Sequence, residues 1–426
     1  MKPPVRSASV PRIAARQAGI ALIAMVAFLG IVAAVFVVRS LNADTLAAGQ
    51  HQRTAEALQA AREALLAYAA TDANRPGALP CPDIDGDGQS LPGVEYTGSG
   101  CQSYIGRLPW RLLRIPELRD ASGELLWYAL SPEFRDAGPL AGSPPFVNPD
   151  TPAVLTIAGL PGTFGAILFA PGQALQQQAR SGPGANALVN YLDGVNATPT
   201  LVCSAGLPGP AFNDRLLPVS GTELVAIAER RVSREVTAAL TAYFDQYRFL
   251  PSPAEFADVQ CVNADFVPPS GCLPVPGVLA GRLPGSVSPA EAYSLPGSPW
   301  PNSALLRGES VLPAQYDLAW FQLQRWREHV VYIVSPNCVG PPATNCTAGT
   351  LRLRGAAGTV DDARFAVLMA GPAGPGQVRT SPADKSTFVN YLEGTALSAA
   401  QALAGGTVPT QIMVPGGTIV AAPRTN

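Results

Sequence analysis

Hydrophobic and polar positions change their spacing along this chain, and each spacing predicts a different element. Every residue from Ala18 to Val38 is uncharged, and the stretch has the roughly 20-residue length that a helix needs to cross a bilayer. Beyond it, Leu58, Ala61, Leu65 and Tyr68 recur at helical spacing and form one apolar stripe. The pattern predicts a membrane helix that continues into an amphipathic stalk.

A second long helix and several strands follow. Ser220-Gly221-Thr222-Glu223 has the pattern of a helix N-cap, and the apolar residues after it keep helical spacing to Tyr243. Short apolar runs predict strands at Leu125–Leu130, Phe164–Phe169, Val330–Val334 and Phe365–Met369, and a hairpin of Gln411–Val414 with Thr418–Ala421. Helices packed across small antiparallel sheets make an α+β fold.

The exported part reads as two copies of one unit. Each copy has a helix, a Leu-Pro element, a Gly-Cys pair, a Gly-Arg-Leu-Pro element, two apolar runs and a closing phrase in the same order. The matching phrases include Gly106-Arg107-Leu108-Pro109 with Gly281-Arg282-Leu283-Pro284, and Val189-Asn190-Tyr191-Leu192 with Val389-Asn390-Tyr391-Leu392. We interpret the repeated Asn-Tyr as a structural corner, because a repeated fold repeats its framework.

These patterns set the expected domain boundaries. We expect a basic leader over residues 1–19, a transmembrane helix over 20–38, a stalk helix over 39–74, a first α+β head over 75–200, a linker over 201–219, a second head with its own helix over 220–397, and a tail with the hairpin over 398–426.

Charge gives the expected orientation. Four basic and no acidic residues precede the apolar span, namely Lys2, Arg6, Arg12 and Arg16, so the positive-inside rule keeps the N-terminus cytoplasmic. The rest of the chain is acidic and contains one lysine, Lys385, which leaves no basic footprint for nucleic acid. The 43 prolines and 41 glycines alternate with apolar runs, which favours long ordered loops over disorder.

All seven cysteines lie beyond the apolar span, in the compartment where disulfides form. Their positions in the repeat favour three pairs, namely Cys81–Cys101, Cys261–Cys272 and Cys338–Cys346, although sequence alone does not fix connectivity. Cys203 is left over in the expected linker, available as a free thiol or for a bond between chains. No C-x-x-C pair is present to favour zinc.

The segment Arg16–Ile23 resembles the start of type IV pilin-like proteins, and is most similar to minor pilins and the large minor pseudopilin of type II secretion. The resemblance implies that a prepilin peptidase cuts between Gly19 and Ile20, and that the apolar helix anchors the subunit and later packs in a filament. Ala24 stands where major pilins usually carry a glutamate, which points to a minor or initiating subunit.

The run from Asp83 to Gly88 is the sharpest candidate site. Asp83, Asp85 and Asp87 alternate before a glycine as in the first half of a calcium loop. The twelfth position of an EF-hand would be Val94, and Glu95 misses it by one. An Asp/Gly-rich turn held by Asx bonds is the alternative, and it is the one we favour. We expect no other cofactor.

Enzymatic chemistry has little support. The chain has two histidines far apart, no G-x-S-x-G elbow and no P-loop lysine. We expect a structural subunit of a type IV pilus or type II secretion-like assembly, anchored in the bacterial inner membrane with periplasmic heads, whose partners are other pilin-like subunits or assembly proteins. The alternative is a permanently anchored single-pass protein whose periplasmic heads bind a ligand or an envelope partner.

Overall fold

The computed structural model describes residues 48–72, 75–98, 100–136, 146–182, 184–206, 209–262, 272–284, 321, 325–340, 346–355, 358–409, 411–413 and 419–421. Contacts divide the chain into two units, residues 1–57 and 58–426. The expected leader, the apolar span and the cut between Gly19 and Ile20 lie outside the described residues. Among the described helices, none is long and apolar enough to cross a membrane.

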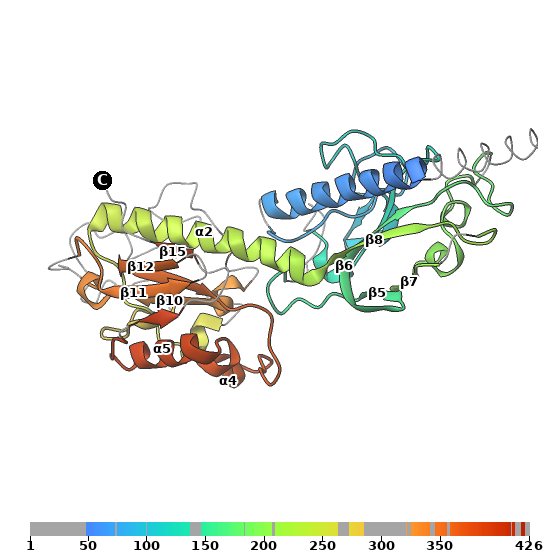
Figure 1. Ribbon diagram of the computed structural model, residues 1–426. Helices are drawn as coiled ribbons and strands as arrows, with labels where there is room; N and C mark the ends of the chain where they lie inside the picture. The colour runs from blue at the N-terminus through green and yellow to red at the C-terminus, as the bar shows by residue number, and fades with distance from the viewer. Residues whose placement is uncertain are drawn as a thin grey trace, which may run out of the picture. The chain divides into compact units, whose positions relative to one another are not determined.

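The first head is built on a mixed six-stranded sheet in the order β3-β4-β6-β5-β7, with β8 also paired to β6 (Figure 1). Residues 48–71 form the first helix, and its residues 58–71 belong to the unit of residues 58–426, which holds both heads. Strands β1 (Tyr96–Thr97) and β2 (Gly100–Cys101) form a separate two-stranded sheet. The strands of the six-stranded sheet are β3 (Ile105–Arg107), β4 (Trp127–Leu130), β5 (Leu155–Ala158), β6 (Leu160–Ala170), β7 (Val202–Ser204) and β8 (Arg215–Ser220), and short 3-10 turns lie at Pro132–Phe134, Leu188–Asn190 and Gly194–Ala197.

The helical stripe expected from the sequence is the buried face of the first helix. Leu58, Ala61 and Leu65 are each at most 5% exposed. Tyr68 donates a hydrogen bond of 2.5 Å from its hydroxyl to the Asp136 carboxylate of the first head. Burial of an apolar stripe is the main source of stability for such a helix, because isolated helices are marginal in water.

Helix α2 (Gly221–Tyr247) begins at the end of β8 and serves both heads. The Ser220 side chain accepts a hydrogen bond from the Glu223 amide, which confirms the expected N-cap. The first part of α2 contacts β6 and β8, and the later part contacts β13 and β15. The two heads therefore share one helix that has no internal glycine or proline.

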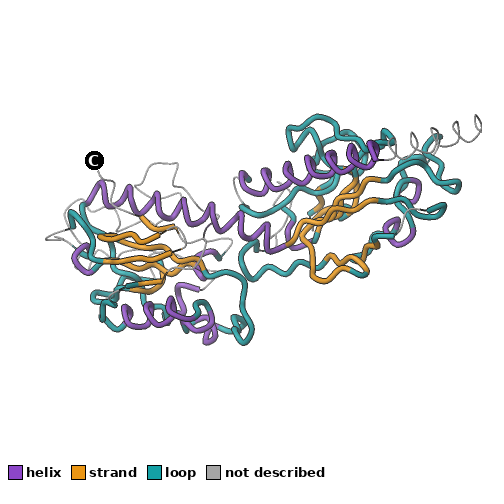
Figure 2. The backbone as a smooth tube through the Cα atoms, in the orientation of Figure 1, coloured by secondary structure: helices purple, strands orange, loops and turns teal. Residues whose placement is uncertain are grey.

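The second head places α2 and α5 on opposite faces of its sheets (Figures 1 and 2). One sheet has the order β15-β13-β10-β9 and the other β12-β11-β14. The elements are β9 (Ala280–Arg282), β10 (Val330–Val334), β11 (Leu351–Gly355), β12 (Gly358–Ala363), β13 (Phe365–Met369), α4 (Pro382–Lys385), α5 (Gly394–Ala404), β14 (Ile412–Met413) and β15 (Ile419–Ala421), with 3-10 turns at Val259–Val262, Trp326–His329, Pro336–Cys338 and Phe388–Asn390.

The α+β expectation is confirmed, and the four predicted strands coincide with or overlap β4, β6, β10 and β13, although the first was predicted to begin two residues before β4. The predicted linker over residues 201–219 is wrong, because β7 and β8 are strands of the first sheet. The predicted hairpin and the separate tail are also wrong. Strand β14 pairs in parallel with β11, and β15 pairs with β13 in the other sheet, since each short apolar run finds a longer buried strand to extend.

The sheets are also less uniform than expected. Strands β5 and β7 run parallel, as do β11 and β14, whereas the other pairs are antiparallel. The added strands, β7 and β14, are short and lie at the edges of their sheets. A prediction of antiparallel sheets from local apolar runs does not anticipate a parallel edge strand that comes from a distant part of the sequence.

Candidate functional site

The acidic turn folds around the carboxylate of Asp83, which is 1% exposed. Its Oδ1 accepts a hydrogen bond of 2.6 Å from the Gly86 amide, and its Oδ2 accepts one of 2.8 Å from the Gly88 amide. Burial raises the pKa of Asp83 to about 6, although both amide bonds favour the charged form. Gly86 and Gly88 both have positive φ, which explains the glycines in the motif.

The three aspartates do converge. One carboxylate oxygen from each of Asp83, Asp85 and Asp87 lies within 4.8 Å of the others, as a shared cation would require. Asp85 and Asp87 also accept hydrogen bonds from the amides of Asp87 and Gln89, which is the Asx-bonded turn of the alternative prediction. The three carboxylates could hold a hard cation, and the turn has its own hydrogen bonds without one.

Two other charged groups border this turn. Glu95 is 1% exposed, and its carboxylate accepts hydrogen bonds from the amides of Ile84 and Leu91, so the glutamate one place beyond the EF-hand position closes the loop by itself. A side chain at Gly86 would lie 2.9 Å from Nη1 of Arg107. The Arg107 guanidinium therefore lies close to the backbone of the turn.

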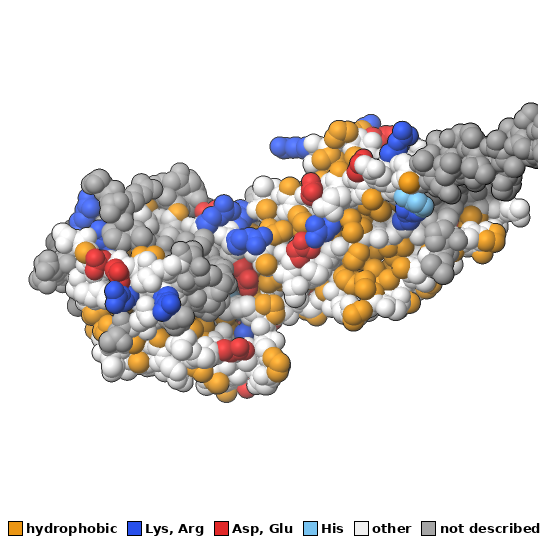
Figure 3. Space-filling model, viewed as in Figure 1, with side chains coloured by type: hydrophobic (Ala, Val, Ile, Leu, Met, Phe, Trp, Pro, Cys, Tyr) orange, Lys and Arg blue, Asp and Glu red, His pale blue; other side chains and the backbone are white. Residues whose placement is uncertain are grey.

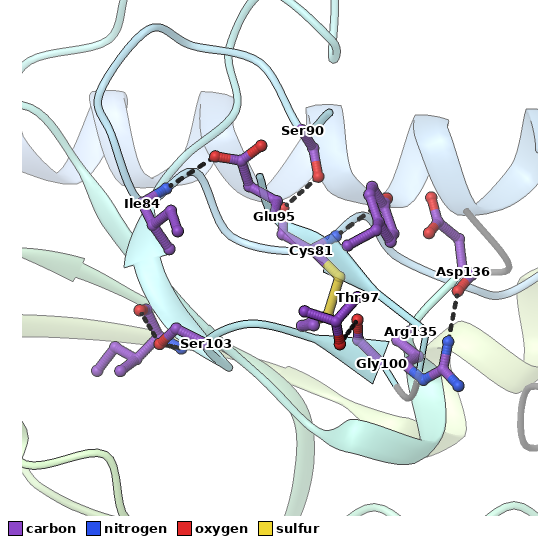
Figure 4. Close-up of a disulfide and its surroundings, with 12 residues drawn as sticks. Cys81, Ile84, Ser90, Glu95, Thr97, Gly100, Ser103, Arg135 and Asp136 are labelled. Atoms are coloured by element: carbon purple, nitrogen blue, oxygen red, sulfur yellow. Dashed lines mark hydrogen bonds between the residues drawn. A yellow bond between two sulfur atoms is a disulfide. The ribbon is translucent and has the colours of Figure 1, made fainter. Parts of the chain in front are cut away.

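The cysteines pair as expected from the repeat. The structure joins Cys81 to Cys101, Cys261 to Cys272, and Cys338 to Cys346. Figure 4 shows the first pair beside Ser90, whose hydroxyl donates to the Cys81 carbonyl, and beside Glu95. The Cys81–Cys101 disulfide joins the start of the acidic turn to strand β2.

Cys203 is free, and it lies in β7 and not in a linker. Its side chain is 2% exposed. Burial, together with the nearby Asp214 carboxylate, raises the pKa of the Cys203 thiol to about 11. Such a thiol is a poor candidate for a bond between chains.

The repeated Asn-Tyr phrase forms the same corner in both heads. In the first, Arg180 donates from Nε to the Asn190 carbonyl and from Nη1 to the Gly172 carbonyl, and its guanidinium lies 5.0 Å from the Tyr191 ring centroid. In the second, Arg379 donates from Nε to the Asn390 carbonyl and from Nη1 to the Gly371 carbonyl, 4.4 Å from the Tyr391 ring.

A second arginine lies close to each tyrosine ring. Arg107 lies 5.2 Å from the Tyr191 ring centroid, and Arg282 lies 4.7 Å from the Tyr391 ring centroid. Both come from the Gly-Arg-Leu-Pro element of the repeat. Guanidinium groups stack favourably on aromatic rings, so the corner is a framework device, as expected. Arg180 and Arg379 were not predicted from the sequence, although each lies two residues after a glutamine, in Gln178-Ala179-Arg180 and Gln377-Val378-Arg379.

The corner of the first head ends in a pair of buried carboxylates. Asp193 accepts hydrogen bonds from the amides of Asn213 and Asp214, and Asp214 accepts from the Asp193 amide and from the Asn196 side chain. Burial raises the pKa of Asp214 to about 7. In the second head, Glu393 takes the place of Asp193, is exposed, and lines an open pocket of about 560 Å³ with Tyr391 and Gly394.

Charged side chains also gather where the first head meets the second. Asp150 of the first head pairs with Arg379, and Glu328 pairs with Lys385 at 2.6 Å. A pocket of about 260 Å³ lies here, lined by Glu133, Phe146, Asn148, Asp150, Thr151, Pro152, Arg325, Glu328, Arg379 and Lys385. His329 is fully buried beneath this cluster.

No family model, no curated protein and no solved structure matches this chain.

Proposed function

We propose that this chain is a minor pilin-like or pseudopilin-like subunit, anchored in the bacterial inner membrane, with two joined heads on the periplasmic side. The apolar segment Ala18–Val38 with its basic leader, placed ahead of a helix that packs on an α+β head, carries the proposal. In such a subunit the apolar helix has two successive environments, lipid and the core of a filament.

Two features of the heads support this proposal. Three disulfides are typical of proteins outside the cytoplasm. The heads pack against two long helices, the first helix and α2, and α2 contacts strands of both heads. A duplicated head joined in this way is bulky, which fits an accessory or tip position better than a repeating shaft.

Exposed apolar side chains on the first head support contact with other subunits. Leu160, Leu201 and Val202 are each more than 40% exposed, and Leu201 and Val202 lie at the start of the edge strand β7. Figure 3 shows hydrophobic side chains gathered over the part of the head that holds β5 and β6. Apolar surface on an open strand edge is a common site of protein association.

The mature N-terminus tests the proposal directly. Mass spectrometry of the full chain from native membranes is expected to find a chain that begins at Ile20, with an N-methylated amine. The matched control is a Gly19→Val chain, which a prepilin peptidase should leave uncut. A native chain that begins at Met1 would contradict the proposal.

The alternative function is a permanently anchored protein whose periplasmic heads bind a ligand or an envelope partner. The pocket of about 560 Å³ in the second head is the observation in its favour, because ligand pockets have volumes of this order. A chain that keeps Met1 and does not cross-link to any pilin-like protein would support this alternative.

A further inference from the structure

The corner of the first head holds a short segment of its own chain, Asn213-Asp214, which leads into strand β8. Oδ2 of Asp193 accepts hydrogen bonds from the Asn213 amide at 2.7 Å and from the Asp214 amide at 3.3 Å. In return, the Asp214 carboxylate accepts bonds from the Asp193 amide at 2.8 Å and from the Asn196 side chain at 2.9 Å. Segment and corner therefore exchange hydrogen bonds in both directions.

The same segment also covers the end of β6. The Asn213 side chain donates from Nδ2 to the Gln173 carbonyl at 2.7 Å, and a side chain at Gly172 would lie 3.0 Å from Cγ of Asn213. The next residue along the chain, Arg215, pairs with Ala170 at the end of the strand. The segment thus rests on Ala170, Gly172 and Gln173 as well as on the corner.

The repeat identifies the counterpart of each of these residues in the second head. Arg180 bonds to the Gly172 carbonyl as Arg379 bonds to the Gly371 carbonyl, so Gly371 is the counterpart of Gly172. After each closing phrase, Gly194 and Gly394 have φ of 53° and 55°. These two anchors give the other counterparts, which are Met369 for Ala170, Pro372 for Gln173, Glu393 for Asp193 and Ala396 for Asn196.

All five counterparts, namely Met369, Gly371, Pro372, Glu393 and Ala396, line the pocket of about 560 Å³. The pocket therefore has the same place at the second corner that Asn213-Asp214 has at the first. Glu393 is exposed there, and within the described part of the chain no hydrogen bond joins its amide or its carboxylate to another residue.

The second head has no sequence counterpart of Asn213-Asp214. Strand β15 pairs with β13 as β8 pairs with β6, and the register matches Ala421 with Val219. Counted back by the same number of residues, the positions of Asn213 and Asp214 correspond to Pro415 and Gly416, which lie outside the described residues. Proline has no amide hydrogen and glycine has no carboxylate, so these residues cannot repeat the bonds of the first head.

The lining of the pocket keeps the groups that recognise such a segment. The Glu393 carboxylate can accept backbone amides, the Pro372 carbonyl can accept a side-chain amide, and the Glu393 amide can donate to a carboxylate. Thr395 adds a hydroxyl where the first head has Val195, and the Tyr391 and Leu392 side chains supply apolar walls. A free inorganic anion would meet the Glu393 carboxylate, whereas a peptide presents amide donors to it and a carboxylate beside it.

We propose that this pocket binds a segment of a partner protein that contains an aspartate, in the way in which the first head binds its own Asn213-Asp214. The first head is then an internal template for the complex, with backbone amides on the corner carboxylate and the aspartate on the corner amide. The inference does not depend on the pilin-like assignment, because the pocket lies wholly within the second head.

Isothermal titration calorimetry on the full chain in detergent micelles at about pH 7 tests this site. The probe is a heptapeptide with the sequence of residues 211–217, Ala-Phe-Asn-Asp-Arg-Leu-Leu, acetylated and amidated so that its ends carry no charge. We expect saturable binding of one peptide per chain. The same peptide with alanine in place of the aspartate should bind about tenfold more weakly, as the loss of a hydrogen bond to a charged group predicts.

The Glu393→Ala chain should also bind the peptide about tenfold more weakly. Gln401→Ala is the matched control, because Gln401 is exposed on the same helix α5 and does not line this pocket, and it should bind as the wild-type chain does.

Three results would overturn the proposal: no saturable binding up to about 1 mM peptide, equal binding of the alanine peptide, or equal losses in Glu393→Ala and Gln401→Ala. The comparison of the two peptides uses the unchanged chain, so it stays decisive even where a variant folds poorly. Binding in micelles needs neither cleavage of the leader nor a filament, so its failure would leave the proposed function untouched.

Discussion

The two heads use the same corner, and they differ in where it finds its charge. In the first head, Arg180 pairs with Glu124 from the same sheet, and the next carboxylate, Asp193, is capped by the amides of Asn213 and Asp214. In the second head, Arg379 pairs with Asp150 from its neighbour, and Glu393 stands exposed beside an open pocket. The difference indicates that the corner arginine of the first head finds its carboxylate within that head, whereas the corner arginine of the second head finds its carboxylate on the first head.

Helix α2 gives the sharpest way to test whether the heads are one folding unit. Leu224 packs against Gly165 of the first head, whereas Leu240 lies in the core of the second, and both are fully buried. Leu224→Ala and Leu240→Ala should each lower the free energy of unfolding by about 2–5 kcal/mol, because each leaves a cavity. Urea unfolding followed by circular dichroism should show a single transition that both changes shift; two transitions, each moved by one variant only, would contradict this.

The paired arginines provide the next largest effect. Arg180→Gln and Arg379→Gln each remove the cation from a partly buried ion pair and from two carbonyl groups. Each should lower the free energy of unfolding by about 3 kcal/mol. Thermal unfolding of both variants beside exposed Arg352→Gln, which should change little, measures it. An effect of Arg379→Gln no larger than that of Arg352→Gln would show that the second corner does not depend on its arginine.

The carboxylate pair of the first head, Asp193 and Asp214, predicts a pH dependence of stability. The folded chain holds a proton on Asp214 up to about pH 7, whereas an unfolded aspartate loses its proton near its ordinary pKa of 3.8. The contribution of Asp214 to stability is therefore full below about pH 4 and falls as the pH rises toward 7, by about 2 kcal/mol after allowance for relaxation of the site.

Urea titrations across this range should show that Asp214→Asn flattens part of the pH slope. Asp83 and Glu229, whose pKa values are also raised, contribute slopes of the same sign and remain in the variant. Glu393→Gln in the second head is the control and should leave the slope as it is. An unchanged slope in Asp214→Asn would show that Asp214 is ionised throughout.

The acidic turn should show the smallest effect when metal is removed. Asp83 is held by two amides, and Arg107 and Glu95 border the turn, so we expect the melting temperature to be the same with 1 mM calcium as with a chelator, within the usual few tenths of a degree. Calcium-dependent stabilisation that disappears in an Asp85→Asn, Asp87→Asn double variant would instead establish a cation site. The second copy of the repeat has no counterpart of the Asp83–Gly88 motif in its sequence, so the second head is the internal reference for the effect of calcium.

The repeat, the helical stripe, the N-cap at Ser220 and the longer strands were predictable because each rests on local spacing that any compact fold must respect. The disulfide partners were also predictable from the sequence, because the repeat places the two cysteines of each pair around one loop. Predictions failed for the residues 201–219 and for the C-terminal strands. The runs within residues 201–219 are short and proline-rich, and they become strands because β5 and β6 offer them edges. The two C-terminal runs are apolar and were predicted as strands, but they pair with β11 and β13 instead of with each other.

By itself, the sequence determined that this is an α+β protein with a duplicated head, a long apolar segment near its start and cysteines confined to the part beyond it. Only the tertiary structure decided that α2 belongs to both heads, that Cys203 is buried, and that Arg379 meets Asp150. The physical reason is the separation along the chain over which each interaction acts. Periodicity and caps act over a few residues, whereas burial and ion pairing join residues whose separation along the chain leaves no trace in local pattern.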